Sequence, residues 1–97
     1  MTGKQRAYLR AQANSLETIL YVGKGGITDT VIQQANEALA ARELIKGRVL
    51  EASPLTAREA CEQLAEATGA EGIQTIGSRF VLYRPDPKDP KYILPKA

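Results

Sequence analysis

Two periods of hydrophobic and polar positions divide this chain into predicted helices and strands. Apolar residues recur every three or four positions, the spacing of helices with one buried face, in three stretches: 3–14, 29–42 and 57–68. Each stretch follows a threonine that can cap its first turn. Shorter β-branched and aromatic runs predict four strands: 18–22, 44–50, 73–76 and 79–84.

The order of these elements predicts an α+β sandwich with a small mixed sheet. The two strand–helix–strand units predict parallel strands, and the Gly77-Ser78 pair predicts a two-residue hairpin that adds one antiparallel strand. The second and third helices should cover the same face of the sheet. This reasoning assigns no place to the first helix.

Length and composition bound the function classes. The 97 residues predict one domain, residues 1–85, followed by an extended proline-rich tail, residues 86–97. No apolar run approaches the roughly 18 residues of a membrane span, and the single cysteine, Cys61, allows no internal disulfide. We therefore expect a cytoplasmic protein without membrane association.

A glycine-rich segment, Gly23-Lys24-Gly25-Gly26, joins the first predicted strand to the second helix. Glycines let the backbone turn tightly and approach a bulky ligand, and a helix start carries partial positive charge. The segment lacks the spacing of a Walker loop or of a dinucleotide fingerprint. Two interpretations stay open. The segment is a turn that binds nothing, or it clamps phosphate through the amides of Gly25 and Gly26 and the Lys24 ammonium.

Charge is distributed unevenly, although the formal net charge is only +2. Lys and Arg outnumber Asp and Glu in residues 1–24 and 79–97. In residues 61–78, by contrast, all charged side chains are acidic. The candidate basic surface consists of Lys4, Arg6, Arg10, Lys24, Lys46, Arg48, Arg79 and Arg84. Such a surface suits a polyanion, and a solvated face without a partner is the alternative.

Alternation along the strand 44–50 predicts where two of these cations point. Ile45 and Val49 face one side of the sheet, and Lys46 and Arg48 face the other. The first side should be buried beneath helices, and the second should be basic and solvated.

Few residues suit catalysis or metal binding. The chain has no histidine, and Cys61 lies on the apolar side of the third helix, where a packed core thiol is expected. The carboxylates of Glu59, Glu62 and Glu66 lie at helical spacing on a solvated side and form a poor metal site. We expect neither an enzyme nor a bound metal or cofactor.

Tyr21 and Phe80 lie in predicted strands, where we expect both rings in the core. A sheet face with exposed aromatic rings is therefore not predicted. A nucleic acid would be recognised through its shape and backbone more than through its bases.

Three motifs in this order resemble the YhbY family, the bacterial stand-alone form of the CRM (chloroplast RNA splicing and ribosome maturation) domain. They are the Gly23–Gly26 loop after Tyr21-Val22, the segment Glu43-Leu44-Ile45-Lys46, and the stretch from Ile76 to Pro85. The opening pattern Lys4-Gln5-Arg6-x-x-Leu9-Arg10 is also similar to the start of the family. The resemblance covers roughly residues 3–85.

The resemblance implies a two-layer fold similar to the C-terminal domain of translation initiation factor three, with sheet order 1-2-4-3. It also implies an RNA-binding protein that assists maturation of the large ribosomal subunit. Separately, we expect a monomer. Gly23 and Gly26 match the fixed glycines of the family's G-x-x-G loop, which is likened to the backbone clamp of KH domains. Ribosomal RNA or large-subunit precursor particles would be the partner.

Two other classes of function stay open. The first is a protein-interaction module that docks to a ribosomal protein or an assembly factor. The second is a small enzyme or nucleotide-binding protein that uses the glycine loop. A protein of this class would be stabilised by mononucleotides in a thermal-shift screen, and we expect no such shift.

Overall fold

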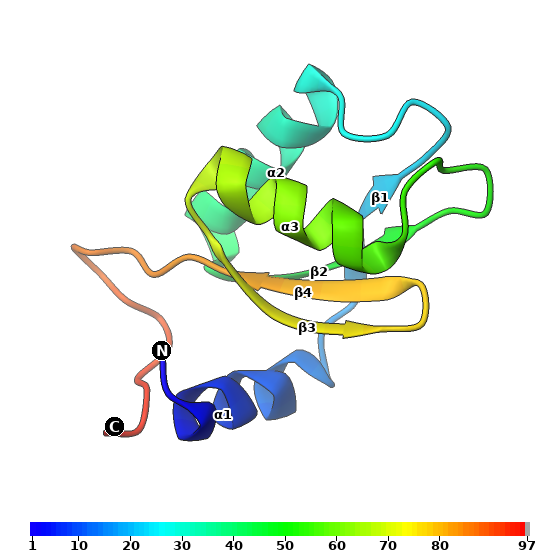
Figure 1. The fold of residues 1–97 in the computed structure, drawn as a ribbon. Helices are drawn as coiled ribbons and strands as arrows, with labels where there is room; N and C mark the ends of the chain where they lie inside the picture. Colours follow the sequence, from blue (N-terminus) through cyan, green and yellow to red (C-terminus); the bar gives the residue numbers. More distant parts are fainter. Residues whose placement is uncertain (97) are drawn as a thin grey trace.

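The computed structural model describes residues 1–96, and its elements follow the predicted order (Figure 1). In this part of the chain they are α1 (Gly3–Ala13), β1 (Thr18–Val22), α2 (Asp29–Arg42), β2 (Leu44–Val49), α3 (Ala57–Thr68), β3 (Glu71–Ile76) and β4 (Arg79–Tyr83). Threonine hydroxyls cap all three of these helices, and the side chains of Gln5 and Glu59 complete capping boxes at α1 and α3. Across residues 1–96, no helix is long and apolar enough to cross a membrane.

The strands form one mixed sheet in the order β1-β2-β4-β3, which confirms the α+β class and the expected strand order. β1 and β2 are parallel, and β4 is antiparallel to both β2 and β3. Gly77, with φ of 57°, makes the tight turn between β3 and β4. β3 begins at Glu71, earlier than the pattern predicted, because a bulge between Gly72 and Gln74 interrupts the alternation.

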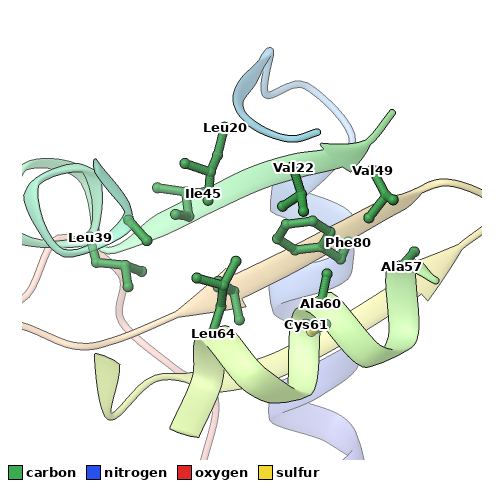
Figure 2. Close-up of a cluster of buried hydrophobic side chains, with 12 residues drawn as sticks. Leu20, Val22, Leu39, Ile45, Val49, Ala57, Ala60, Cys61, Leu64 and Phe80 are labelled. Carbon is green, nitrogen blue, oxygen red and sulfur yellow. The ribbon is translucent and has the colours of Figure 1, made fainter. Parts of the chain in front are cut away.

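α2 and α3 pack on the same face of the sheet and enclose the main core, as predicted (Figure 2). Phe80 of β4 lies at the centre of this core and is 1% exposed. Its ring lies over Gly47, the residue paired with it on β2, at the position where a β-carbon would stand. The missing side chain of Gly47 therefore makes room for the largest ring of the core.

α1 lies on the opposite face of the sheet, so the sheet has helices on both sides and the two-layer description fits only α2, α3 and the sheet (Figure 1). Leu9 and Ala13 of α1 form a second buried cluster with Leu44 of β2 and with side chains of β3 and β4. The prediction that this face is solvated is therefore wrong near Leu44. It holds only beyond α1, where Lys46 is half-buried and Arg48 is exposed.

Residues 86–96 form no helix or strand, and this tail is docked against the rest of the chain. Its aromatic and aliphatic side chains, Tyr92 and Leu94, pack against the α1 cluster. The side-chain amide of Gln5 donates a hydrogen bond of 3.1 Å to the carbonyl oxygen of Pro95, which holds the end of the tail beside the start of α1.

Glu43 is the anchor of this tail. It is fully buried and has φ of 65°, a conformation that costs a non-glycine residue about 1–3 kcal/mol. Its carboxylate accepts hydrogen bonds from the amides of Asp86 and Lys91, and its carbonyl oxygen accepts one from the amide of Arg84. The strained turn between α2 and β2 thus places a carboxylate where it binds the tail backbone.

Glu43→Ala should release the tail and lower the free energy of unfolding by about 2 kcal/mol, because two hydrogen bonds to a charged acceptor are lost while the backbone strain remains. Hydrogen exchange should become fast at the amides of Asp86 and Lys91. Glu66→Ala, which removes an exposed carboxylate from α3, is the control and should change neither property. Unchanged protection of the tail amides in Glu43→Ala would contradict the anchoring role.

Candidate functional site

Three connections meet at one end of the sheet, which we call the loop end: the Gly23–Gly26 loop, residues 50–56 and the Gly77-Ser78 turn (Figure 1). The backbone joins them directly. The amide of Leu50 donates to the carbonyl oxygen of Val22 at 2.8 Å, and the amide of Val49 donates to that of Ser78 at 2.7 Å. The opposite end of the sheet carries Glu43 and the tail.

The Gly23–Gly26 loop is a closed turn. The amide of Gly26 donates to the carbonyl oxygen of Gly23 at 3.0 Å, and Gly26 has φ of 68°, which glycine adopts without steric cost. Its amide is therefore not free for a ligand, which corrects the expectation that both Gly25 and Gly26 offer donors. Among the hydrogen bonds of residues 1–96, none uses the amide of Lys24 or Gly25, and both residues are exposed.

One side of this loop is covered and the other is open. Gly26 is buried, and a β-carbon on it would lie 3.6 Å from Pro54 and 3.8 Å from Leu55. Gly23 packs in the same way against Leu50. The neighbouring 50–56 loop therefore supports the inner side of the turn, while Lys24 and Gly25 form its solvent-exposed tip.

Four side chains form a row across the sheet at the loop end, and we call it the cross-strand row: Tyr21, Arg48, Arg79 and Ile76. Tyr21 pairs with Arg48, Arg48 with Arg79, and Arg79 with Ile76, so the register places all four on the face that α1 leaves open. All four side chains are exposed.

Arg48 and Arg79 stand opposite each other on antiparallel strands. Because Val49 and Ser78 form the hydrogen-bonded pair next to them, the two arginines form a non-hydrogen-bonded pair, in which side chains lie closest together. Neither guanidinium forms an ion pair with a carboxylate of residues 1–96. Asp29, the first residue of α2, and Glu51, in the 50–56 loop, are exposed acids at this end, and neither lies within salt-bridge distance of an arginine.

Tyr21 contradicts the sequence prediction, because it is 50% exposed, whereas Phe80 is buried as expected. β1 is an edge strand, so no neighbouring strand covers the outer side of Tyr21. Alternation alone cannot distinguish an edge strand from a central one. The expected strand order 1-2-4-3 contained the signal, since it places the first strand at an edge.

The other predicted basic residues separate into two groups. α1 runs along β3, so Arg6 lies near the start of β3. Ala13 and Asn14, at the end of α1, line a small pocket with Ile76 and Arg79 near the end of β3. Arg10 is exposed one turn beyond Arg6 on the same side of α1, toward the loop end. Lys4, at the first turn of α1, belongs to the opposite end of the molecule (Figure 1).

Two of the predicted site arginines are half-buried and donate hydrogen bonds to other parts of the protein. Arg6 donates to the carbonyl oxygen of Gly72 and lies 3.6 Å from the carboxylate of Glu71. The guanidinium of Arg84 donates to the side chain of Asn36 at 2.7 Å and to the carbonyl oxygen of Thr68 at 2.8 Å. Arg84 therefore connects α2 to α3 far from the loop end, and the structure does not bring it to the glycine loop.

Cys61 is a core thiol, as its position on α3 predicted. Burial, with a smaller contribution from the Glu62 carboxylate, raises the pKa of Cys61 to about 11. The thiol is therefore protonated at neutral pH and is a weak nucleophile. The Glu62 carboxylate itself pairs with Arg58 at 3.3 Å on the exposed side of α3.

The exposed amides of the loop tip, Lys24 and the arginine pair give this end of the sheet free hydrogen-bond donors and positive charge, the chemistry that anion-binding surfaces use. A model of the CRS1 / YhbY (CRM) domain matches residues 1–84, and the chain belongs to this family, which confirms the resemblance found in the sequence. The matched region contains the complete sheet and all three helices.

Several relatives are similar over nearly the whole chain. YqeI of Bacillus subtilis, named a probable RNA-binding protein, is 41% identical over 95 residues, which cover 98% of this chain and 99% of YqeI. A probable RNA-binding protein of Methanocaldococcus jannaschii is 38% identical over 98 residues, covering 99% of this chain and 72% of that protein. The solution structure of the hypothetical protein SAV1595 from Staphylococcus aureus has a TM-score of 0.82 and 42% identity, covering 98% and 99% of the two chains.

Proposed function

We propose that this chain binds RNA through the loop end of its sheet. The observation that carries the proposal is the Arg48–Arg79 pair, two adjacent cations without a carboxylate partner among the described residues, on the same end as the exposed tip of the glycine loop. The naming of the relatives as probable RNA-binding proteins supports RNA as the polyanion.

The proposed contacts use the hydrogen-bond donors that have no partner among the described residues. The amides of Lys24 and Gly25 and the Lys24 ammonium bind phosphate at the loop tip, where donors are exposed and the start of α2 adds partial positive charge. Arg48 and Arg79 bind phosphates on the open face, and Arg10 extends this surface along α1. Arg84 and Lys4 are left out, because the first is bonded internally and the second lies at the opposite end.

We further propose that the bound RNA is ribosomal RNA or a large-subunit precursor. This narrower proposal rests on the family resemblance alone. Crosslinking in cells, followed by sequencing of the attached RNA, tests it, and enrichment of large-subunit precursor RNA is the expected result. Crosslinks confined to other RNAs would contradict the ribosomal proposal and leave RNA binding intact.

Lys24→Glu should weaken binding to unrelated RNA sequences by about tenfold each, because Lys24 contacts the backbone that all of them share. The slope of log affinity against log salt concentration should fall by about one. Fluorescence anisotropy with labelled hairpins at several salt concentrations measures both quantities.

Lys88→Glu is the matched control, because it makes the same charge change on an exposed tail residue distant from the loop end. It should alter the affinity far less than Lys24→Glu. Equal losses in both variants would mean that only the overall charge matters, and an affinity of the unaltered protein that is independent of salt would refute phosphate contacts.

A further inference from the structure

The cross-strand row contains two cationic and two apolar or aromatic side chains. Phosphate binding alone does not require the apolar and aromatic ones. Its centre is the arginine pair, and its two outer positions are apolar or aromatic, with Ile76 64% exposed and Tyr21 50% exposed. A site for backbone phosphates alone would need only the cations. The row therefore has the composition of a surface that contacts a base as well as a phosphate.

The pairing of Arg48 with Arg79 lowers the stability of the folded chain. Like charges that face each other across antiparallel strands repel, and no carboxylate of residues 1–96 relieves this pair. An anion placed between the two guanidinium groups would relieve the repulsion and accept hydrogen bonds from both. One phosphate group, with several acceptor oxygens, fits this position.

Tyr21 stands beside this pair, two residues before the glycine loop. Its hydroxyl donates to the carbonyl oxygen of Thr18 at 3.4 Å, so the ring lies back along the outer edge of β1. There it borders an open depression of about 620 Å³ at the outer edge of the sheet, toward α2. The other lining residues of this depression are Ile19 of β1 and Gln34, Glu37, Ala38 and Arg42 of α2. The ring is thus held from one side and has open space beside it.

We infer that the cross-strand row binds an unpaired nucleotide, with its phosphate on Arg48 and Arg79 and its base stacked on Tyr21. This inference rests on the proposed RNA-binding function and adds the substrate class to it. A base inside a continuous duplex is stacked on both sides and cannot reach Tyr21, whereas an unpaired base can. The chain therefore binds a single-stranded segment or a duplex with a single-stranded flank more tightly than a blunt duplex. Stacking accepts all four bases, because each has a π face.

The test compares two labelled RNAs, a blunt-ended duplex of two annealed strands and the same duplex with a single-stranded extension of six nucleotides. Anisotropy titrations of the intact chain give the ratio of the two affinities. The unaltered protein should favour the extended RNA, and Tyr21→Leu should reduce this preference about tenfold, since loss of one base stack costs about 1–3 kcal/mol. Tyr21→Phe, which retains the ring, should keep the preference within about twofold.

A second readout locates the base. Extensions that carry 5-bromouracil should crosslink on irradiation to the peptide that contains Tyr21, as identified by mass spectrometry. Crosslinks to a different surface would overturn the inference, as would an unchanged preference in Tyr21→Leu or an equal loss in Tyr21→Phe. If the chain binds both duplexes equally and with a strong salt dependence, the nucleotide site is wrong and the phosphate contacts stand. If neither duplex binds, the proposed function itself fails.

Discussion

Gly47→Ala should lower the free energy of unfolding by about 3 kcal/mol, one of the two largest effects that we expect from a single substitution in this chain. A β-carbon at Gly47 would lie within 2.9 Å of three atoms of the Phe80 ring. The ring is 1% exposed at the centre of the main core, with Val22, Val49 and Ala60 beside it, so it cannot turn out into solvent (Figure 2). Denaturant unfolding followed by circular dichroism measures the loss, which is a large part of a typical domain stability of about 5–15 kcal/mol.

Two further variants separate crowding from other causes. Gly3→Ala places a methyl group where no atom lies within 4 Å, and it should leave stability unchanged or slightly raised. Phe80→Leu removes the ring, so the double variant Gly47→Ala/Phe80→Leu should be more stable than the sum of the two single losses predicts. If the two losses simply add, the close approach of Phe80 to Gly47 is not the cause.

Arg48→Glu should have opposite effects on folding and on binding. The substitution replaces a like-charge pair with an ion pair across β2 and β4, which should raise the free energy of unfolding by a few tenths of a kcal/mol. The same change removes a guanidinium from the proposed phosphate site and adds a repulsive carboxylate. Loss of a charge-assisted hydrogen bond is worth about 1.5–3 kcal/mol, so RNA affinity should fall about 10- to 100-fold.

Thermal unfolding and anisotropy titrations on the same preparation measure both effects. Arg48→Gln, which removes the charge without reversing it, should fall between the unaltered protein and Arg48→Glu in affinity. Lys88→Glu again controls for overall charge. Retained RNA affinity in Arg48→Glu would exclude the arginine pair from the interface, whereas lower stability together with lower affinity would indicate damage to the sheet.

The local structure of this chain could be predicted because each element carries its own signal. Thr2, Thr28 and Thr56 cap the three helices, and Gly77 makes the hairpin turn that the sequence indicates. The strand order could be expected from the family resemblance but not from periodicity. Alternation specifies the two faces of a strand without specifying its neighbours.

The features that could not be predicted depend on contacts between distant segments. Nothing near Glu43 in the sequence indicates that its carboxylate binds the tail, or that Arg84 binds Asn36 across 48 positions. The closed turn depends on the hydrogen bond from the amide of Gly26 to the carbonyl oxygen of Gly23. A glycine-rich segment can form this bond, but its composition does not predict that the bond forms. Aromatic residues in strands are usually buried, which predicts a core position for Tyr21, and only its position at the sheet edge reverses this.

The hydrogen bond between Gln5 and Pro95 has a consequence for how this domain can be joined to other chains. It holds the beginning and the end of the fold side by side, at the end of the molecule that faces away from the glycine loop (Figure 1). Two copies fused in tandem by a short flexible linker would therefore keep both loop ends, the proposed RNA-binding surfaces, unobstructed. Such a fusion would raise the local concentration of the second site once the first is occupied, and avidity for long RNA would grow without any new contact.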